Sequence, residues 1–201
     1  MNKKSEILLK CKGRCAIIKR SKAQYFRGGS TIKNSKIRLL CITGVFAALV
    51  FVVTAYLHIP TVNGYVHVGD GLIYLAACIL PLPYAIAVGA CGALLADCLT
   101  GYAIWAPCSV IVKAASAALF SSRSRRIVCF RNLAALLPAA ILCIGGYYLY
   151  EALLYGNFVS PLAGMLASLT QAVASSALFI AAGLSVDKMG LKSMLNGGKQ
   201  P

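Results

Sequence analysis

Two charged residues stand inside an apolar stretch of the sequence, residues 92–114, which reads GALLADCLTGYAIWAPCSVIVKA. They are Asp97 and Lys113, and a charge at bilayer depth costs between about 2.5 and more than 10 kcal/mol. Each lies eight positions from Trp105, which stands at the apex of a turn between two helices. Both charges therefore lie about 12 Å from the apex, on antiparallel helices. We expect Asp97 and Lys113 to pair with each other at one depth, in the outer half of the membrane.

Such a pair has two interpretations. Intramembrane ionisable residues commonly mark a ligand or ion path, whereas a buried ion pair can also do no more than lock two helices together. Further polar residues favour the first: Asp70 begins a short apolar segment, and Gln171 lies about eleven residues into the last one. The sequence therefore predicts a polar pocket that opens outward. The candidate substrate-binding residues are Asp70, Asp97, Trp105, Lys113 and Gln171.

Composition identifies the class of protein. Of the 201 residues, 59% are hydrophobic and 12% are charged, and the mean hydropathy is +0.77, which indicates an integral membrane protein. The net charge of +15 comes from Lys and Arg clustered in residues 1–38, in 123–131 and after 186. This clustering is what the positive-inside rule produces. Since the sequence contains no nucleic-acid-binding module, we expect a lipid bilayer and no nucleic acid as partner.

Apolar runs predict an all-α bundle of six transmembrane helices. The basic clusters must share the cytoplasmic side, which places both termini in the cytoplasm. The predicted spans are residues 37–57, 70–81, 83–102, 105–120, 132–150 and 160–184. They give a membrane domain of residues 37–185 between a basic cytoplasmic tail, 1–36, and a short cytoplasmic tail, 186–201. Residues 1–36 are either a genuine tail or an over-long gene start.

Several kinds of chemistry are disfavoured. The nine cysteines do not have the spacing of a disulfide framework or a zinc site. The sequence lacks His-Glu-x-x-His, Gly-x-Ser-x-Gly and a phosphate-binding glycine loop, so a membrane enzyme is the weaker alternative, and we expect no cofactor and no metal. A self-sufficient secondary transporter of a small polar metabolite is the stronger alternative, although we find no convincing inverted repeat.

Small residues indicate where helices approach each other closely. Ala85, Gly89 and Ala93 lie four apart and lead to Asp97, so we expect the aspartate to continue a packed face and to point into the bundle. In the first span, Gly44 and Ala48 have the same spacing, with Ala47 beside them.

Three segments together resemble a known family. HVGDGLIYLAA (67–77), GALLADCLTGY (92–102) and WAPCSVIVK (105–113) occur in the order found in the substrate-binding S components of energy-coupling factor (ECF) vitamin transporters. The likeness is to the branch grouped with riboflavin-type S components, which also includes carriers assigned to hydroxymethylpyrimidine and pyridoxine. It covers about residues 37–185.

The resemblance implies a function. Such S components are six-helix proteins of the prokaryotic plasma membrane with both termini in the cytoplasm. They bind a vitamin or vitamin precursor near the outer face, under the loop after the first helix, here residues 58–69. They assemble with a transmembrane coupling subunit and two cytoplasmic ATPases, so the chain itself is not expected to be an enzyme.

The family pattern also assigns residues. It carries over to Asp70 and Trp105 as ligand-contact positions at the pocket mouth. It also carries over to Asp97 and Lys113, which either bind the ligand directly or orient each other. The family's Ala-x-x-x-Ala contact with the coupling subunit becomes Gly44-x-x-x-Ala48 here, with Ala47 adjacent. The aromatic rim and the buried charges suit a small flat heterocycle. Hydroxymethylpyrimidine, pyridoxine and riboflavin all remain open.

Overall fold

The computed structural model describes residues 31–61, 65–124, 126–190 and 192. The chain divides into two compact units, residues 1–38 and 39–201. In the first unit, only the start of helix α2 (Thr31–Tyr56) is described, so most of the predicted basic tail lies outside the described residues. Most of the predicted C-terminal tail does so as well. The second unit holds the rest of α2 and every later element.

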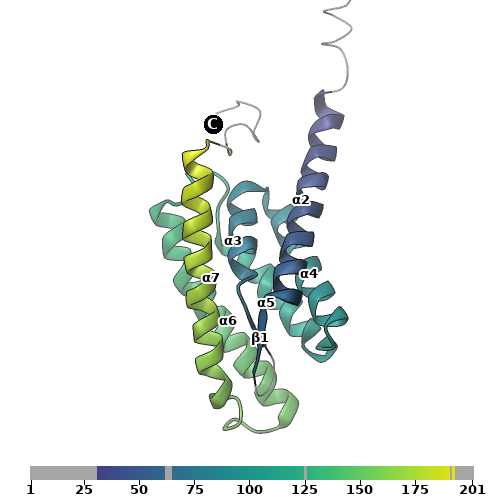
Figure 1. Cartoon of the computed structure of the whole chain (residues 1–201), viewed down its shortest axis with the longest axis vertical. Coiled ribbons are helices and arrows are strands. Elements are labelled where there is room, and N and C mark those ends of the chain that lie inside the picture. The colour runs from purple at the N-terminus through teal and green to yellow at the C-terminus, as the bar shows by residue number, and fades with distance from the viewer. Residues whose placement is uncertain (1–30, 62–64, 125, 191, 193–201) are drawn as a thin grey trace, which may run out of the picture. The chain divides into compact units, whose positions relative to one another are not determined.

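This unit is mostly helical, as predicted (Figure 1). After α2, a short antiparallel hairpin pairs strands β1 and β2, with His58 opposite His67. Five further α-helices and one 3₁₀ turn follow. In chain order the elements are β1 (His58–Pro60), β2 (Tyr65–His67), α3 (Asp70–Ile79), α4 (Leu82–Leu99), η1 (Ala103–Trp105), α5 (Ala106–Leu119), α6 (Phe130–Tyr155) and α7 (Leu162–Lys188).

Among the described residues, four helices are long and apolar enough to cross a bilayer: Lys36–Tyr56, Leu82–Leu99, Phe130–Tyr155 and Leu162–Lys188. The chain is therefore a multi-pass membrane protein. Helices α3 and α5 are shorter than the usual span of ~20 residues. The six helices fall where the six apolar runs predicted them, within a few residues, except that α2 begins earlier and α6 ends later.

Proline separates α3 from α4, at the boundary that the predicted spans 70–81 and 83–102 share. Leu80, before Pro81, is extended and closes α3, because proline disfavours helical backbone in the residue that precedes it. Pro83 then lies in the first turn of α4, where its missing N–H costs no hydrogen bond. The break lets two helices form where hydropathy alone shows one long apolar run.

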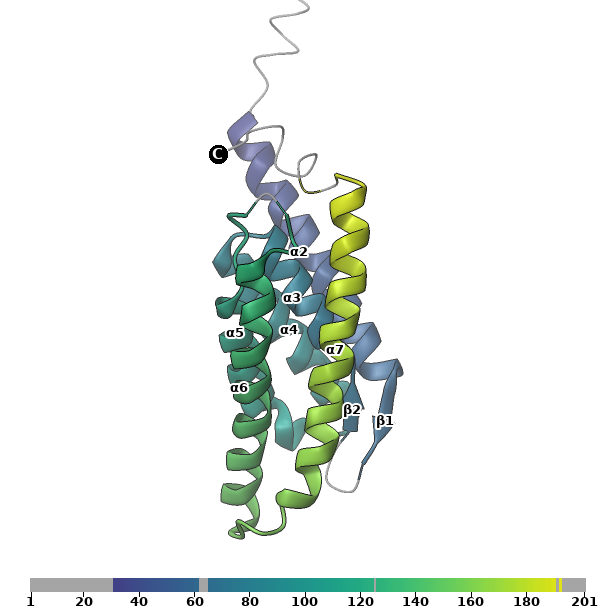
Figure 2. The same ribbon diagram turned by 90° about the vertical axis from the view of Figure 1, so that its left-hand side faces the viewer.

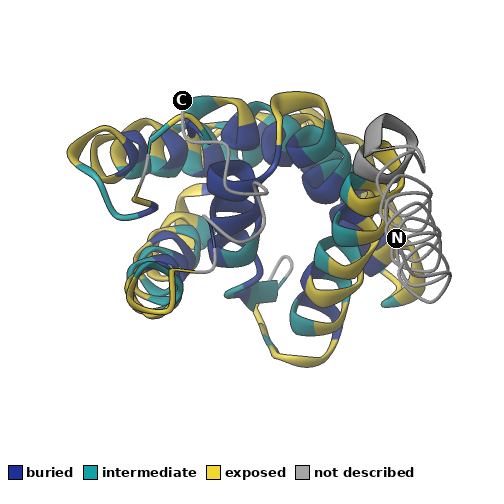
Figure 3. Ribbon diagram, turned by 90° about the horizontal axis from the view of Figure 1, so that it is seen from above, coloured by how far each residue is buried: buried dark blue, intermediate teal, exposed yellow. Residues whose placement is uncertain are grey.

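Helix α3, the shortest of the described α-helices, lies at the centre of the bundle. Nine of its ten residues are buried, and it packs against α4, α5 and α7. Buried residues gather toward the centre in Figure 3, while the outer faces of the surrounding helices are exposed. Gly71 permits the contact with α7, because a Cβ there would lie 2.6 Å from the backbone oxygen of Ser175. The first residue of α3, Asp70, is thereby held inside the protein.

Helices α4 and α5 pack closely as an antiparallel pair joined by η1. A Cβ on Gly89 would lie 3.0 Å from the backbone oxygen of Lys113, so any larger residue would push the two helices apart by a few tenths of an ångström. Ala85, Ala93 and Asp97 are buried on the same side of α4. This confirms the prediction that Asp97 continues the packed face and points inward.

Helices α6 and α7 form the other side of the bundle and run antiparallel (Figures 1 and 2). Strand β2 packs against α7, which brings the hairpin over the end of the bundle where α4 and α6 end and α5 and α7 begin. The opposite end is fastened by Asp187, whose carboxylate accepts hydrogen bonds from the backbone N–H groups of Ile127 and Val128 at 2.8 and 3.0 Å. The two ends of the bundle are therefore chemically different.

Candidate functional site

A pocket lies at the hairpin end of the bundle. It encloses about 600 Å³ of empty space, the open solvent at its mouth included. The hairpin and its loop, α4, η1, α5, α6 and α7 all contribute to it. The lining residues are Thr61, Tyr65, Val66, His67, Asp97, Trp105, Ser109, Tyr147, Glu151, Gly164, Ala167, Ser168 and Gln171.

Beneath the pocket lies a buried ion pair between Lys113 and Asp70. Lys113 Nζ is 2.7 Å from Asp70 Oδ1 and donates to Oδ2 at 2.8 Å. The predicted pair between Lys113 and Asp97 is therefore wrong. Counting residues along two helices gave similar depths for these two charges, but the carboxylate that reaches Lys113 comes from the central helix α3. Neither Asp70 nor Lys113 lines the pocket, contrary to the simplest expectation for ligand contacts.

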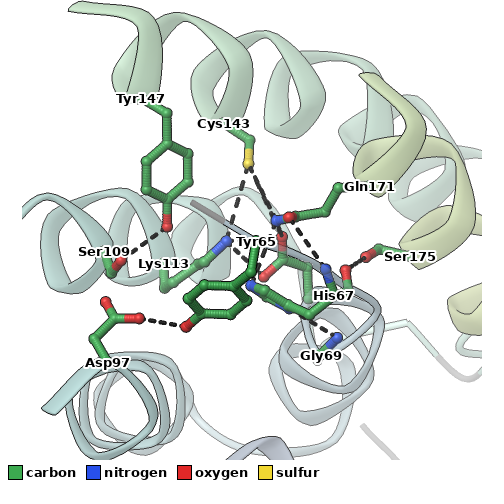
Figure 4. Close-up of polar contacts among 11 residues, drawn as sticks. Tyr65, His67, Gly69, Asp97, Ser109, Lys113, Cys143, Tyr147, Gln171 and Ser175 are labelled. Atoms are coloured by element: carbon green, nitrogen blue, oxygen red, sulfur yellow. Dashed lines mark hydrogen bonds and ion pairs between the residues drawn. The ribbon is translucent and has the colours of Figure 1, made fainter. Parts of the chain in front are cut away.

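Gln171 connects the ion pair to the pocket and to the hairpin. Its Nε2 donates to Asp70 Oδ2 at 3.0 Å, and its Oε1 accepts from the backbone N–H of His67 at 3.4 Å. The side chain itself lines the pocket. In Figure 4 it extends from α7 toward the same centre as Lys113 and Cys143. One amide therefore joins α3, α7 and β2.

His67 is a buried, neutral histidine at the end of β2. Its Nδ1 accepts a hydrogen bond from the backbone N–H of Gly69 at 3.1 Å, so the ring proton lies on Nε2. Burial lowers the pKa of His67 to about 4, outweighing the opposite effect of Asp70. Protonation of Nδ1 would break the hydrogen bond from Gly69, which also favours the neutral ring.

Asp97 forms part of the pocket wall and is only partly hydrogen-bonded. The hydroxyl of Tyr65 donates to its Oδ1. Its other oxygen, Oδ2, has no hydrogen-bond partner among the described residues, although the side chain is only 3% exposed. Burial, and then the neighbouring Asp97 carboxylate, raise the pKa of Tyr65 well above its ordinary value, so the phenol keeps the proton that it donates.

Aromatic rings surround the pocket. The Trp105 ring centroid lies 6.3 Å from that of Tyr147 and 5.8 Å from that of Tyr150. The Tyr65 ring centroid lies 4.7 Å from that of Tyr102. The Tyr147 hydroxyl is hydrogen-bonded to Ser109 Oγ at 2.9 Å, and Lys113 Nζ lies 5.1 Å from the Tyr147 ring centroid. These rings offer flat faces to a bound ring system.

The structure thus divides the predicted residues between two layers. Asp97, Trp105 and Gln171 line the pocket, and Asp70 and Lys113 lie below it. Sequence reasoning did not select several other lining residues. These are Tyr65, His67, Ser109, Tyr147 and Glu151.

One sequence signal for the missed residues was available. Cys143, Tyr147 and Glu151 are four apart on α6, which is the spacing of one helix face, and Ser109 is four before Lys113 on α5. No such periodicity marks Tyr65 and His67, which belong to a strand of three residues.

The described residues contain no group of three or more His, Cys, Asp or Glu side chains that could hold a metal ion. The residues expected to contact a coupling subunit lie apart from the pocket, on α2. Gly44 and Ala48 are exposed, and a Cβ on Gly44 would meet nothing within 4 Å. Ala47 is half-buried, and its backbone oxygen faces Gly92 of α4.

Comparison with known proteins identifies a family. A protein-family model described as "ECF-type riboflavin transporter, S component" matches residues 34–186, about three quarters of the chain and all of the residues that form the pocket. A search of curated proteins finds no match.

Proposed function

Because the chain belongs to the family of ECF-type riboflavin transporter S components, we propose that the pocket under the β1–β2 hairpin binds a vitamin or vitamin precursor with a small heterocyclic ring. The resemblance seen in the sequence is confirmed by the family match, and the chain is the substrate-specific membrane subunit of an ECF transporter. The observation that carries the proposed site is a pocket in which aromatic and polar side chains from separate elements converge.

We assign direct ligand contact to Asp97, Trp105 and Gln171. Trp105 offers a flat apolar face, while Asp97 and Gln171 supply polar atoms that fix the orientation of a ring. Asp70 and Lys113 act from below, since they bond to each other and Asp70 fixes the amide of Gln171. Their effect on ligand binding is therefore to position the floor of the pocket.

The pocket faces the outside of the cell in this proposal. Arg123, Arg126 and Arg131 lie in and next to the α5–α6 connection, and Lys188 ends α7; both positions are at the opposite end of the bundle from the pocket. The positive-inside rule places that basic end in the cytoplasm. Six spans with both termini in the cytoplasm follow if α3 and α5 each cross with their neighbours.

The proposed partners are a transmembrane coupling subunit and two cytoplasmic ATPases in a prokaryotic plasma membrane. The exposed face of α2 around Gly44 and Ala48 suits close contact with another helix, since the missing side chain leaves the backbone accessible. Gly44→Leu should leave ligand binding unchanged and abolish assembly, because four extra carbons occupy the contact. Co-purification with the coupling subunit measures this, and equal recovery of variant and wild type would refute the contact.

The pocket assignment is tested by filling it. Trp105, the only tryptophan in the sequence, lies in the pocket wall and reports on occupancy through its fluorescence. Titration of the purified chain with riboflavin, pyridoxine and hydroxymethylpyrimidine should give saturable quenching with at least one of them. Ala167→Phe, on the pocket wall, should abolish the response, and Ala181→Phe, exposed on the same helix, should preserve it. Equal binding by both variants would contradict the assignment.

The alternative of a self-sufficient secondary transporter makes a different prediction. Vesicles that contain only this chain would then take up the ligand when an ion gradient is imposed. The S-component assignment predicts ligand binding by the chain alone, but uptake only when the coupling subunit and ATPases are also present.

A further inference from the structure

We propose that the pocket selects a heterocycle that donates an N–H group to Asp97 and that carries no phosphate or carboxylate group. This inference rests on the proposed function and adds the charge and hydrogen-bonding character of the substrate. Its starting point is the contrast between the acids at the pocket and the lysine beneath it.

The charges that line the pocket have one sign. Asp97 and Glu151 are lining residues, and among the described lining residues there is no lysine or arginine. Lys113 lies nearby but both oxygens of Asp70 are within 2.8 Å of its Nζ. An anionic ligand group would therefore meet two carboxylates and a cation that already has a partner.

Asp97 provides the specific contact. Its Oδ2 is buried in the wall without a hydrogen-bond partner among the described residues. A buried acceptor left unbonded is unfavourable, and hydrogen bonds to ionised groups are roughly twice as strong as neutral ones. A ring N–H or amino group of the ligand supplies the missing donor. Tyr65 holds the other oxygen, so the orientation of the carboxylate is fixed before the ligand enters.

Glu151 adds to the same selectivity. Its side chain is 6% exposed, and a Cβ on Gly164 would lie 3.5 Å from Glu151 Oε2. The carboxylate of Glu151 on α6 therefore lies beside the α7 backbone in the pocket wall. Like charges placed together in a site of low dielectric repel strongly, so phosphorylated or carboxylated forms of a ring are disfavoured relative to the uncharged form.

The test compares the affinity of the protein for each ring compound with its affinity for the phosphate ester of that compound. Riboflavin, pyridoxine and 4-amino-5-hydroxymethyl-2-methylpyrimidine are each titrated beside the corresponding phosphate monoester, with Trp105 fluorescence as the readout. Wild type should bind at least one parent ring, and should bind that parent about tenfold or more tighter than its ester. Asp97→Asn should weaken binding of the parent ring by about 10- to 100-fold, because an amide N–H replaces a carboxylate acceptor. It should also reduce the difference in affinity between parent and ester, because it removes the negative charge.

Tyr65→Phe is the matched control, since it removes the hydroxyl bonded to Asp97 but keeps the carboxylate charge. This variant should bind the parent ring more weakly and keep the difference in affinity between parent and ester. A merely structural role of Asp97 would weaken parent and ester equally in the Asp97→Asn variant, and that result would overturn the inference. So would an ester that wild type binds as tightly as its parent, or failure of all three parents to bind.

The two proposals fail in different ways. If the ester binds as well as the parent and Ala167→Phe still abolishes binding, the charge selectivity is wrong and the pocket stands. If Ala167→Phe binds the parent normally, the pocket itself is wrongly placed, and the selectivity argument falls with it.

Discussion

Asp70 and Asp97 are two aspartates of almost equal burial, 1% and 3% exposed, and they differ in the partners that hold them. Asp70 is bonded by Lys113 and by Gln171, and lies at the first residue of the central helix. Asp97 has no ammonium beside it among the described residues: the neutral hydroxyl of Tyr65 bonds its Oδ1, and its buried Oδ2 has no hydrogen-bond partner there.

The comparison distinguishes an aspartate that stabilises the fold from one that is available to bind a ligand. A buried carboxylate whose two oxygens both lie against a buried ammonium has little capacity left for a ligand, whereas one held only by a neutral phenol is unfavourable until a ligand supplies a donor. Burial alone does not distinguish the two cases. The comparison predicts that changes at Asp70 act mainly on folding, and changes at Asp97 mainly on binding.

The largest expected effect is from Asp70→Asn. It leaves the Lys113 ammonium buried, 2% exposed, without its counter-charge, and breaking such a pair costs about 3–5 kcal/mol. We expect the free energy of unfolding in detergent to fall by that amount. The double variant Asp70→Leu with Lys113→Met should recover most of the loss, because it removes both charges. If the stability of Asp70→Asn is unchanged, Asp70 does not stabilise the fold and the distinction between Asp70 and Asp97 is wrong.

The second effect is a loss of stability in acid through His67, whose ring is buried and hydrogen-bonded within the protein. Its pKa is about 4 in the fold against 6.5 unfolded, so only the unfolded chain gains a proton between these values. Stability is full above pH 6.5, falls as the pH is lowered toward 4, and loses at most about 3 kcal/mol.

Thermal unfolding measured from pH 7.5 to 4 checks this dependence. His58, Asp70 and Lys113 are the other ionisable groups that act on His67, so His67→Gln serves as the control that isolates its contribution. That variant should show a flatter profile in the same window. Parallel profiles for variant and wild type would show that another group titrates.

The smallest effect on folding is expected from Asp97→Asn. The amide keeps the bond with Tyr65 through its oxygen and removes an incompletely bonded charge, so stability should change by less than about 1 kcal/mol or should rise. Unfolding of the ligand-free variant measures this beside the loss of binding. A loss as large as that of Asp70→Asn would show that Asp97 supports the fold.

The sequence predicted more of the fold than of the site. Apolar runs located all six helices, the Pro81–Pro83 break separated α3 from α4, and the small residues before Asp97 predicted its inward face. These features are local and periodic, so one chain suffices to read them. The span count and the position of the termini remain proposals.

The site depended on contacts that sequence spacing does not encode. Counting rise along α4 and α5 gave the depths of Asp97 and Lys113 but not the direction of their side chains, so the third helix that supplies Asp70 was missed. Tyr65 and His67 come from a hairpin too short to show a period. The stripe of Cys143, Tyr147 and Glu151 on α6 was readable, because a four-residue spacing marks one helix face.

The most direct measurement of the central claim is mass spectrometry of small molecules released from the purified chain. The method identifies any ligand that stays bound through purification, whatever its structure. We predict that wild type and Ala181→Phe release the same heterocycle, with an N–H donor and no phosphate, in near-equal amount to protein, and that Ala167→Phe releases none. Release of the same compound in equal amount from Ala167→Phe would show that the ligand binds elsewhere.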